Sequence, residues 1–385
     1  MAKPNDFGTL IDLTKTTQAL ISHFQSSLAP STTAPAPPQG ESSSASPVDV
    51  PNPLDAIRAT TTLLRSHTTT LSLLLLTPPL TPSAIIKKIG DVSSGALSGM
   101  VAVAASAPQP GQRDELGTWM RAEVRARVRR VLVAWGDVLV LVRLFAERRE
   151  VLQKNKHATS KGKDEGPTED EKQDVLAATG VVWEASDALL QLCADGVVGL
   201  VVKKAEEWRA TLMDAVEELK EWGEDVEDDN EDNSGEDDDG FADEDDLFGA
   251  ENKLGKDDTE LKALLDTSVK KLKKIGMLYQ ALIKRRLKTF PTSATATPTG
   301  TSNESSPNPI PTLDQLMTLL KAIPDTVDEL ASTFYDLDDE EVRQTLDKCC
   351  GEAKSAVGLV KQSWGGKDDE FTAWSGKWVD AFDAA

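Results

Sequence analysis

The chain has 385 residues, of which 64 are acidic and 42 basic, so its formal net charge at pH 7 is −22. This balance argues against nucleic acid as the partner of the bulk surface, because affinity for a phosphate backbone depends on neutralising it with Lys and Arg. A chain of this length and apolar content can form two or three domains with ordinary hydrophobic cores.

Cysteine usage and apolar runs bound the cellular setting. Cys193, Cys349 and Cys350 form no CxxC pair and no disulfide framework, which is typical of the reducing cytosol and nucleus. The N-terminus lacks the apolar stretch of a secretory signal, and runs such as 197–202 are far shorter than the roughly 20 residues of a membrane span. We therefore expect a cytoplasmic and nuclear protein with no membrane partner.

The chain begins with one amphipathic helix. Apolar residues recur at helical spacing from Phe7 to Leu28, and Asp6 is a suitable N-cap. We expect this helix within residues 1–29, followed by a disordered Pro/Ser/Thr linker at 30–51. Because the linker is flexible, the first helix could dock on either half of the chain.

Residues 52–223 are predicted to form an N-terminal helical bundle. Its first helix begins at Asn52-Pro53, with Asn as the cap and Pro in the first turn, and stops at the TPPLTP segment. The next helix has small residues at 94–99, which indicate close helix packing rather than a phosphate-binding loop, since no strand precedes them.

One long helical pattern then runs from Arg113 to about Lys156, roughly 60 Å of helix. Arg121, Arg125 and Arg129 lie at i, i+4 and i+8 on one of its faces. A solvated face is the simplest interpretation of this spacing. The alternative is a docking face for an acidic partner or for an acidic segment of the same chain.

Two more helical patterns, separated by Asp195-Gly196, lead into a strongly acidic segment. Residues 224–246 hold fifteen Asp and Glu in twenty-three positions, with no Lys or Arg. Such dense like charge opposes folding, so we expect a disordered acidic loop over 224–256. Within it, Ser234 is followed by acids two and three residues later, the pattern that acid-directed kinases favour, and is a candidate phosphorylation site.

Residues 257–385 are predicted to form a C-terminal helical bundle with a disordered insertion at 291–311. Its first helix has an apolar stripe whose last position is Arg286, while its other faces are basic. Pro324 is expected to kink or restart a later helix. The basic residues of the first helix that we regard as candidate electrostatic contacts are Lys270, Lys271, Lys273 and Lys274.

No strand pattern persists, so the predicted fold class is all-α, with two up-down helical bundles joined by the acidic loop. His23, His67 and His157 lie on three segments without the spacing of zinc ligands. No GxSxG, P-loop or GxGxxG motif is present, and a mobile acidic loop cannot hold the geometry of acid–base catalysis. We therefore expect no enzyme activity, no metal or other cofactor, and no small-molecule substrate.

Five segments occur in an order that resembles the cyclin-D-binding protein family, also called cyclin-D-interacting or Maid-like proteins. The resemblance extends from about Leu54 to Phe382, with the acidic loop in the expected place and the two Pro/Ser-rich linkers as insertions. The segments are LRSHTTTLSLLLLTPPLTP from Leu64, VVWEASDAL from Val181, KKAEEWRATLMDAVEELKE from Lys203, KLKKIGML from Lys271 and IPDTVDELASTFYDL from Ile323.

The resemblance implies an all-helical protein with two bundles similar to those of talin and vinculin. It also implies a non-enzymatic cell-cycle regulator of the cytoplasm and nucleus. The partners it implies are D-type cyclins and helix-loop-helix transcription factors.

The acidic loop suggests other hypotheses. One is an acidic chaperone or adaptor for basic proteins such as histones, attracted at long range. Nucleic-acid binding by the basic helix at 262–288 is disfavoured, because the neighbouring acids repel phosphate. We also predict that residues 224–246 contact the chain's own basic faces, the alternative being a solvated segment that touches nothing.

Overall fold

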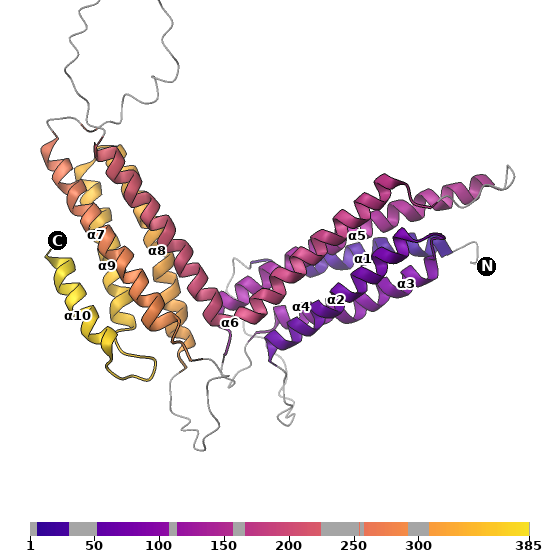
Figure 1. The fold of residues 1–385 in the computed structure, drawn as a ribbon, viewed down its shortest axis with the longest axis horizontal. Helices are drawn as coiled ribbons and strands as arrows, with labels where there is room; N and C mark the ends of the chain where they lie inside the picture. The colour runs from indigo at the N-terminus through magenta and orange to yellow at the C-terminus, as the bar shows by residue number, and fades with distance from the viewer. Residues whose placement is uncertain are drawn as a thin grey trace, which may run out of the picture. The chain divides into compact units, whose positions relative to one another are not determined.

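The computed structural model describes residues 6–30, 52–107, 114–156, 166–224, 254, 258–291 and 308–384. Every regular element in this part of the chain is a helix, which confirms the all-α class. The chain divides into two compact units, Met1–Gly196 and Val197–Ala385 (Figure 1). The predicted disordered regions at 30–51, 224–256 and 291–311 lie almost entirely outside the described residues.

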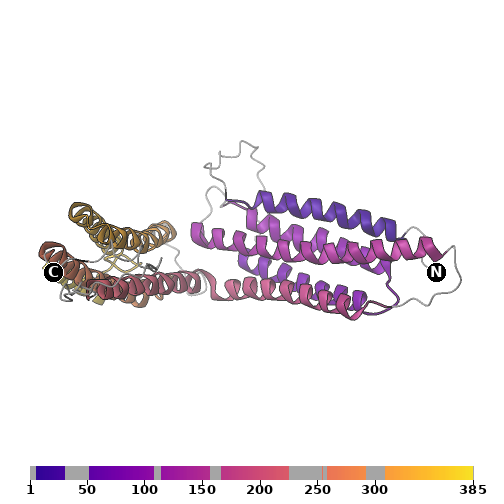
Figure 2. The same cartoon turned by 90° about the horizontal axis from the view of Figure 1, so that it is seen from above.

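The first unit is a bundle of long helices that run lengthwise beside one another (Figure 2). Helix α1 packs on α5 and α3, so the first helix docks on this unit, while α2 packs on α3, η1 and α4. Its elements are α1 (Asp6–Ser27), α2 (Pro53–Leu76), α3 (Pro82–Asp91), the π-helical turn η1 (Val92–Leu97), α4 (Ser98–Ala105), α5 (Gly117–Lys156) and the first half of α6 (Glu169–Glu224).

Local signals of the sequence explain the start of α2 and its packing. The Asn52 side chain accepts a hydrogen bond from the Leu54 amide at 2.9 Å, and Pro53 occupies the first turn, where its missing N–H costs nothing. A Cβ added at Gly99 would lie 3.1 Å from the Thr60 side chain. The small-residue face of α4 therefore allows the close approach to α2 that the sequence predicts.

The first half of helix α6 packs in the first unit and its second half in the second unit, and the helix is interrupted between them. Gly196 has φ 62° and ψ −164°, a conformation essentially restricted to glycine, so the chain breaks its helical path there. Before this point α6 pairs with the first unit, as in Arg65–Asp187 at 2.7 Å. The boundary therefore lies at Gly196, whereas the sequence placed it after residue 223, inside the acidic loop.

The second half of α6 belongs to the core of the second unit. The Arg209 side chain donates a hydrogen bond to the Gly276 carbonyl oxygen at 3.2 Å, and the Trp222 ring lies edge-on to Tyr335. The remaining elements are α7 (Thr259–Leu282), the π-helical turn η2 (Ile283–Leu287), α8 (Ile310–Tyr335), α9 (Asp339–Leu359) and α10 (Glu370–Asp383).

Among the described residues, α6 is the one helix long and apolar enough, by length and composition alone, to cross a membrane. Its most apolar window has a mean hydropathy of 1.5 and is 44% buried within the protein. Leu189, Leu192 and Val201 are among its buried residues.

Pro324 lies inside α8, which continues through it from Ile310 to Tyr335. Proline has no N–H, so the carbonyl of Leu320, one turn earlier, lacks its usual helical donor. The hydroxyl of Tyr279, which is fully buried on α7, donates a hydrogen bond to that carbonyl. Burial also raises the pKa of Tyr279, so the hydroxyl keeps the proton that it donates.

We expect Tyr279→Phe to lower the free energy of unfolding by about 1–3 kcal/mol, because the buried Leu320 carbonyl loses its donor. In a Pro324→Ala chain the same substitution should cost less, since the backbone amide at position 324 then serves that carbonyl. Urea unfolding of the four chains, followed by circular dichroism, measures this coupling.

Tyr335→Phe is the matched control, because its hydroxyl makes only an exposed contact of 3.4 Å to Glu218. Its effect should stay within about 0.5 kcal/mol. Equal costs of Tyr279→Phe with and without Pro324 would show that the hydroxyl does not replace the missing amide.

Candidate interaction surfaces

Two of the three candidate arginines on α5, Arg121 and Arg125, are bound within their own unit. Arg121 forms a 2.8 Å ion pair with Asp114 and donates a hydrogen bond to the Ser106 carbonyl at 2.9 Å, while Arg125 Nε donates one to the Ala104 carbonyl at 3.1 Å. These carbonyls lie at and just beyond the C-terminal end of α4, where cations are favourable. Arg129 Nε is buried and has no hydrogen-bond partner among the described residues. Arg121 and Arg125 therefore serve the end of α4, which their spacing on α5 does not reveal.

Two of the four candidate lysines on α7 are engaged by α10. Lys274 donates a hydrogen bond to the Ala381 carbonyl, and its own carbonyl accepts one from Trp378 Nε1 at 3.0 Å. The Lys271 ammonium lies 6.0 Å from the ring centre of Phe382. Trp378 and Phe382 of α10 are buried and pack against α7.

Lys270 and Lys273, the other two candidates on α7, are exposed. Lys262 and Lys284 are exposed on the same face, and none of the four lysines has an ion pair or hydrogen bond with another described residue. At 100° per residue these positions fall within an 80° sector about 33 Å long. We call these four residues the α7 lysine stripe. Met277, 52% exposed, lies within this sector.

The neighbouring surface of the second unit is acidic. Asp325 and Asp328 are exposed on α8, and Glu218 on α6 is close enough to act on Asp328. Partial burial, and then the charges of Asp325 and Glu218, raise the pKa of Asp328. The other exposed acids on this half of α6 are Glu206, Glu207, Asp214, Glu217, Glu221 and Glu224.

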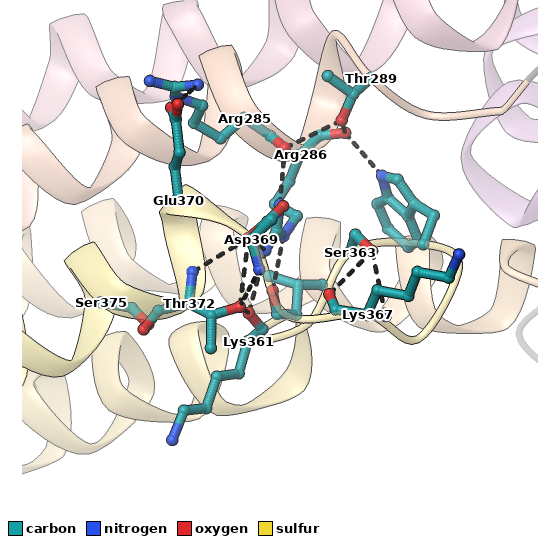
Figure 3. A network of polar contacts seen from close by, with 12 residues as sticks. Arg285, Arg286, Thr289, Lys361, Ser363, Lys367, Asp369, Glu370, Thr372 and Ser375 are labelled. Atoms are coloured by element: carbon teal, nitrogen blue, oxygen red, sulfur yellow. Dashed lines mark hydrogen bonds and ion pairs between the residues drawn. The ribbon is translucent and has the colours of Figure 1, made fainter.

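A buried arginine fastens the segment between α9 and α10 to η2 (Figure 3). Arg286 is 1% exposed and makes a two-pronged contact with Asp369 at 2.7 and 2.9 Å. It also donates hydrogen bonds to the carbonyls of Val360 at 2.7 Å and Lys361 at 3.0 Å. Burying a charged guanidinium costs desolvation free energy. Here nearly all of its N–H donors have acceptors, which offsets that cost.

Aromatic rings and a helix cap complete this network. The Arg286 guanidinium lies 4.3 Å from the ring centre of Phe371, and Trp364 Nε1 donates a hydrogen bond to the Arg286 carbonyl at 2.8 Å. Asp369 also caps α10 through a reciprocal pair of bonds with Thr372. The hydrogen bond from Arg286 holds the pKa of Asp369 well below its usual range.

An open groove of about 550 Å³ lies between α8 and α9. Leu319 and Leu359 are its apolar residues, and Thr318 and Ser355 are among its polar ones. A second hollow, of about 660 Å³, shares Leu359 with this groove and follows the segment that precedes α10.

The described residues contain no cluster of three or more His, Cys, Asp or Glu that could hold a metal ion. Burial raises the pKa of the Cys193 thiol to about 11 and also raises that of Cys349, so neither is a ready thiolate nucleophile. His67 Nδ1 on α2 lies 3.1 Å from the Lys88 ammonium on α3, so this imidazole takes part in a contact between two helices. Ser234 lies outside the described residues.

The fold and these surfaces are those of a helical protein with charged and apolar faces on rigid bundles. Two family models match the chain: "Grap2 and cyclin-D-interacting, N-terminal" over residues 56–225 and its C-terminal counterpart over residues 226–355. The chain therefore belongs to the Grap2 and cyclin-D-interacting family, which confirms the resemblance found in the sequence. The family is named for protein interaction, not for a catalysed reaction.

The chain is also similar to an uncharacterised protein of Schizosaccharomyces pombe, with 24% identity over 342 residues. The match covers 87% of each chain. The two family models meet at residues 225 and 226, whereas the compact units meet at Gly196. The sequence families thus divide the chain in the acidic segment, and packing divides it one helix earlier.

Because the folded-state pKa of Asp369 is depressed, its contribution to stability is present above the unfolded pKa and lost as pH falls through the folded pKa. We expect Asp369→Asn to lower the free energy of unfolding at pH 7 by about 1–3 kcal/mol, since the carboxylate is partly open to water. The variant should also lose less stability than the wild type between about pH 5 and pH 2. Chemical unfolding at a series of pH values measures both effects.

Asp380→Asn, an exposed change on the same helix, is the control and should follow the wild-type profile. Parallel pH profiles for Asp369→Asn and the wild type would contradict the role of this carboxylate.

Proposed function

We propose that this protein is a non-enzymatic interaction module that binds a cyclin or a helix-loop-helix transcription factor and so restrains cell-cycle progression. The observation that carries the proposal is the match of both family models, which together extend over residues 56–355. The ordered segments of the sequence and the acidic loop agree with it. We further propose that the protein acts in the cytoplasm and the nucleus.

We also propose Ser234 as a phosphorylation site that adjusts the charge of the acidic segment. A phosphate adds about −1.5 to −2 charge at pH 7. It would enter a segment that already carries fifteen acids in twenty-three residues. The added charge would therefore strengthen attraction to a basic surface and weaken attraction to an acidic one.

We expect the immobilised full-length protein to bind a purified D-type cyclin or helix-loop-helix factor saturably. A matched chain in which the Asp and Glu of 224–246 become Asn and Gln should retain this binding, because specific recognition rests on a folded face. Surface plasmon resonance measures both chains. Capture from cell extract with mass spectrometry extends the search, and recovery of chaperones and ribosomal proteins alone would remove support for a specific regulator.

The second candidate function is an acidic chaperone or adaptor for basic proteins such as histones. It is favoured by acids that the helices of the second unit hold in place. Partial burial, and then the charges of Asp325 and Glu218, raise the pKa of Asp328 there. Long-range attraction to such a surface is weakened by salt. Titration of histone peptides into the same two chains separates the functions. Equal affinity of the wild type and the neutralised chain for these peptides would contradict a role of 224–246.

A further inference from the structure

The α7 lysine stripe places four positive charges along one face of α7 and the adjoining turn η2, which holds Lys284. Asp266 is the one acid within the same sector, and Glu217, which acts on Lys273 from α6, is itself paired with Lys220 at 3.0 Å. The stripe therefore keeps a net positive charge in a chain whose total is −22. Such a surface attracts a chain segment of opposite charge, and a partly apolar side chain in its middle adds contact area.

The chain itself contains a segment of matching charge next to the stripe. Residues 225–253 carry fifteen acids and one lysine. They connect the end of α6 at Glu224 to the start of α7 at Thr259. A tethered segment has a high effective concentration at a nearby surface. A separate acidic protein must exceed this effective concentration to compete for the surface.

The exit point of this segment is fixed beside the stripe. A Cβ added at Gly223 would lie 2.2 Å from Leu265 Cδ2, so α6 ends in close contact with the first turns of α7. From Leu265 the farthest lysine of the stripe, Lys284, is about 29 Å along the helix. Twenty-nine residues span up to about 100 Å when extended, enough to run along the stripe and return.

We propose that residues 225–253 of this chain lie along the α7 lysine stripe and cover Met277. The contact does not involve Arg121 and Arg125 of α5, because these already bind carbonyls at and just beyond the end of α4. It also excludes Lys271 and Lys274, which α10 engages. The proposal is independent of which regulator the protein binds.

Oxidation of Met277 reports the contact directly. Met277 is exposed, whereas Met213 is half-buried on α6 and serves as an internal reference. The full-length protein is treated with dilute hydrogen peroxide, and sulfoxide formation at both positions is followed by peptide mass spectrometry. Relative to Met213, we expect Met277 to oxidise about three- to tenfold more slowly at low salt than at about 1 M salt, where the Debye length is about 3 Å.

Two variants should abolish this protection at low salt. One replaces the Asp and Glu of 225–246 by Asn and Gln, and the other is Lys270→Glu with Lys273→Glu. The matched control, Lys203→Glu with Lys377→Glu, makes the same charge change at exposed positions outside the stripe and should keep Met277 protected. An unchanged Met213 rate shows that each variant is folded.

Three results would overturn the proposal. Met277 oxidation at one rate in every chain and at both salt concentrations would mean that nothing covers it. Protection that survives neutralisation of 225–246 would assign the cover to another part of the chain. Protection that disappears on dilution would assign it to a second copy.

Discussion

Helix α6 contributes buried residues to the cores of both compact units, and this sharing constrains the rest of the structure. A continuous helix presents one apolar stripe on a fixed side, so a change of core requires a change in backbone direction. Gly196 provides it with a conformation that a Cβ would disfavour. Because amphipathic periodicity continues on both sides of Gly196, the second half of α6 cannot be assigned to a unit from periodicity alone.

The second unit is held together by polar groups that are buried and satisfied. Arg286 and Tyr279 are both fully buried on one stretch of chain, and each serves carbonyls that regular helix geometry leaves open. Arg286 serves carbonyls just beyond the end of α9, and Tyr279 serves the one that Pro324 orphans. A buried donor without its acceptor costs more than the bond contributes, so these contacts specify one arrangement of α7 against α8, α9 and α10.

Most of the fold could be predicted, because helical periodicity and end signals are local. The Asn52 cap and the glycine at 196 were visible as spacing and residue type. Arg286 was visible too, as a charge in the last position of an apolar stripe, but its partner Asp369 is 83 residues away and no local pattern connects them. The role of Arg121 also depends on where α4 ends, which only packing decides.

Cations of similar spacing therefore differ in whether a helix end lies within their reach. Arg125 and Lys274 each meet a carbonyl near the C-terminus of a neighbouring helix, where the peptide dipoles favour positive charge. Lys270 and Lys273 meet no such end and stay exposed. This sorting leaves four exposed lysines along one face of α7 and η2. A partner for that face must exceed the attraction of the chain's own acids, either with denser negative charge or with apolar contact at Met277.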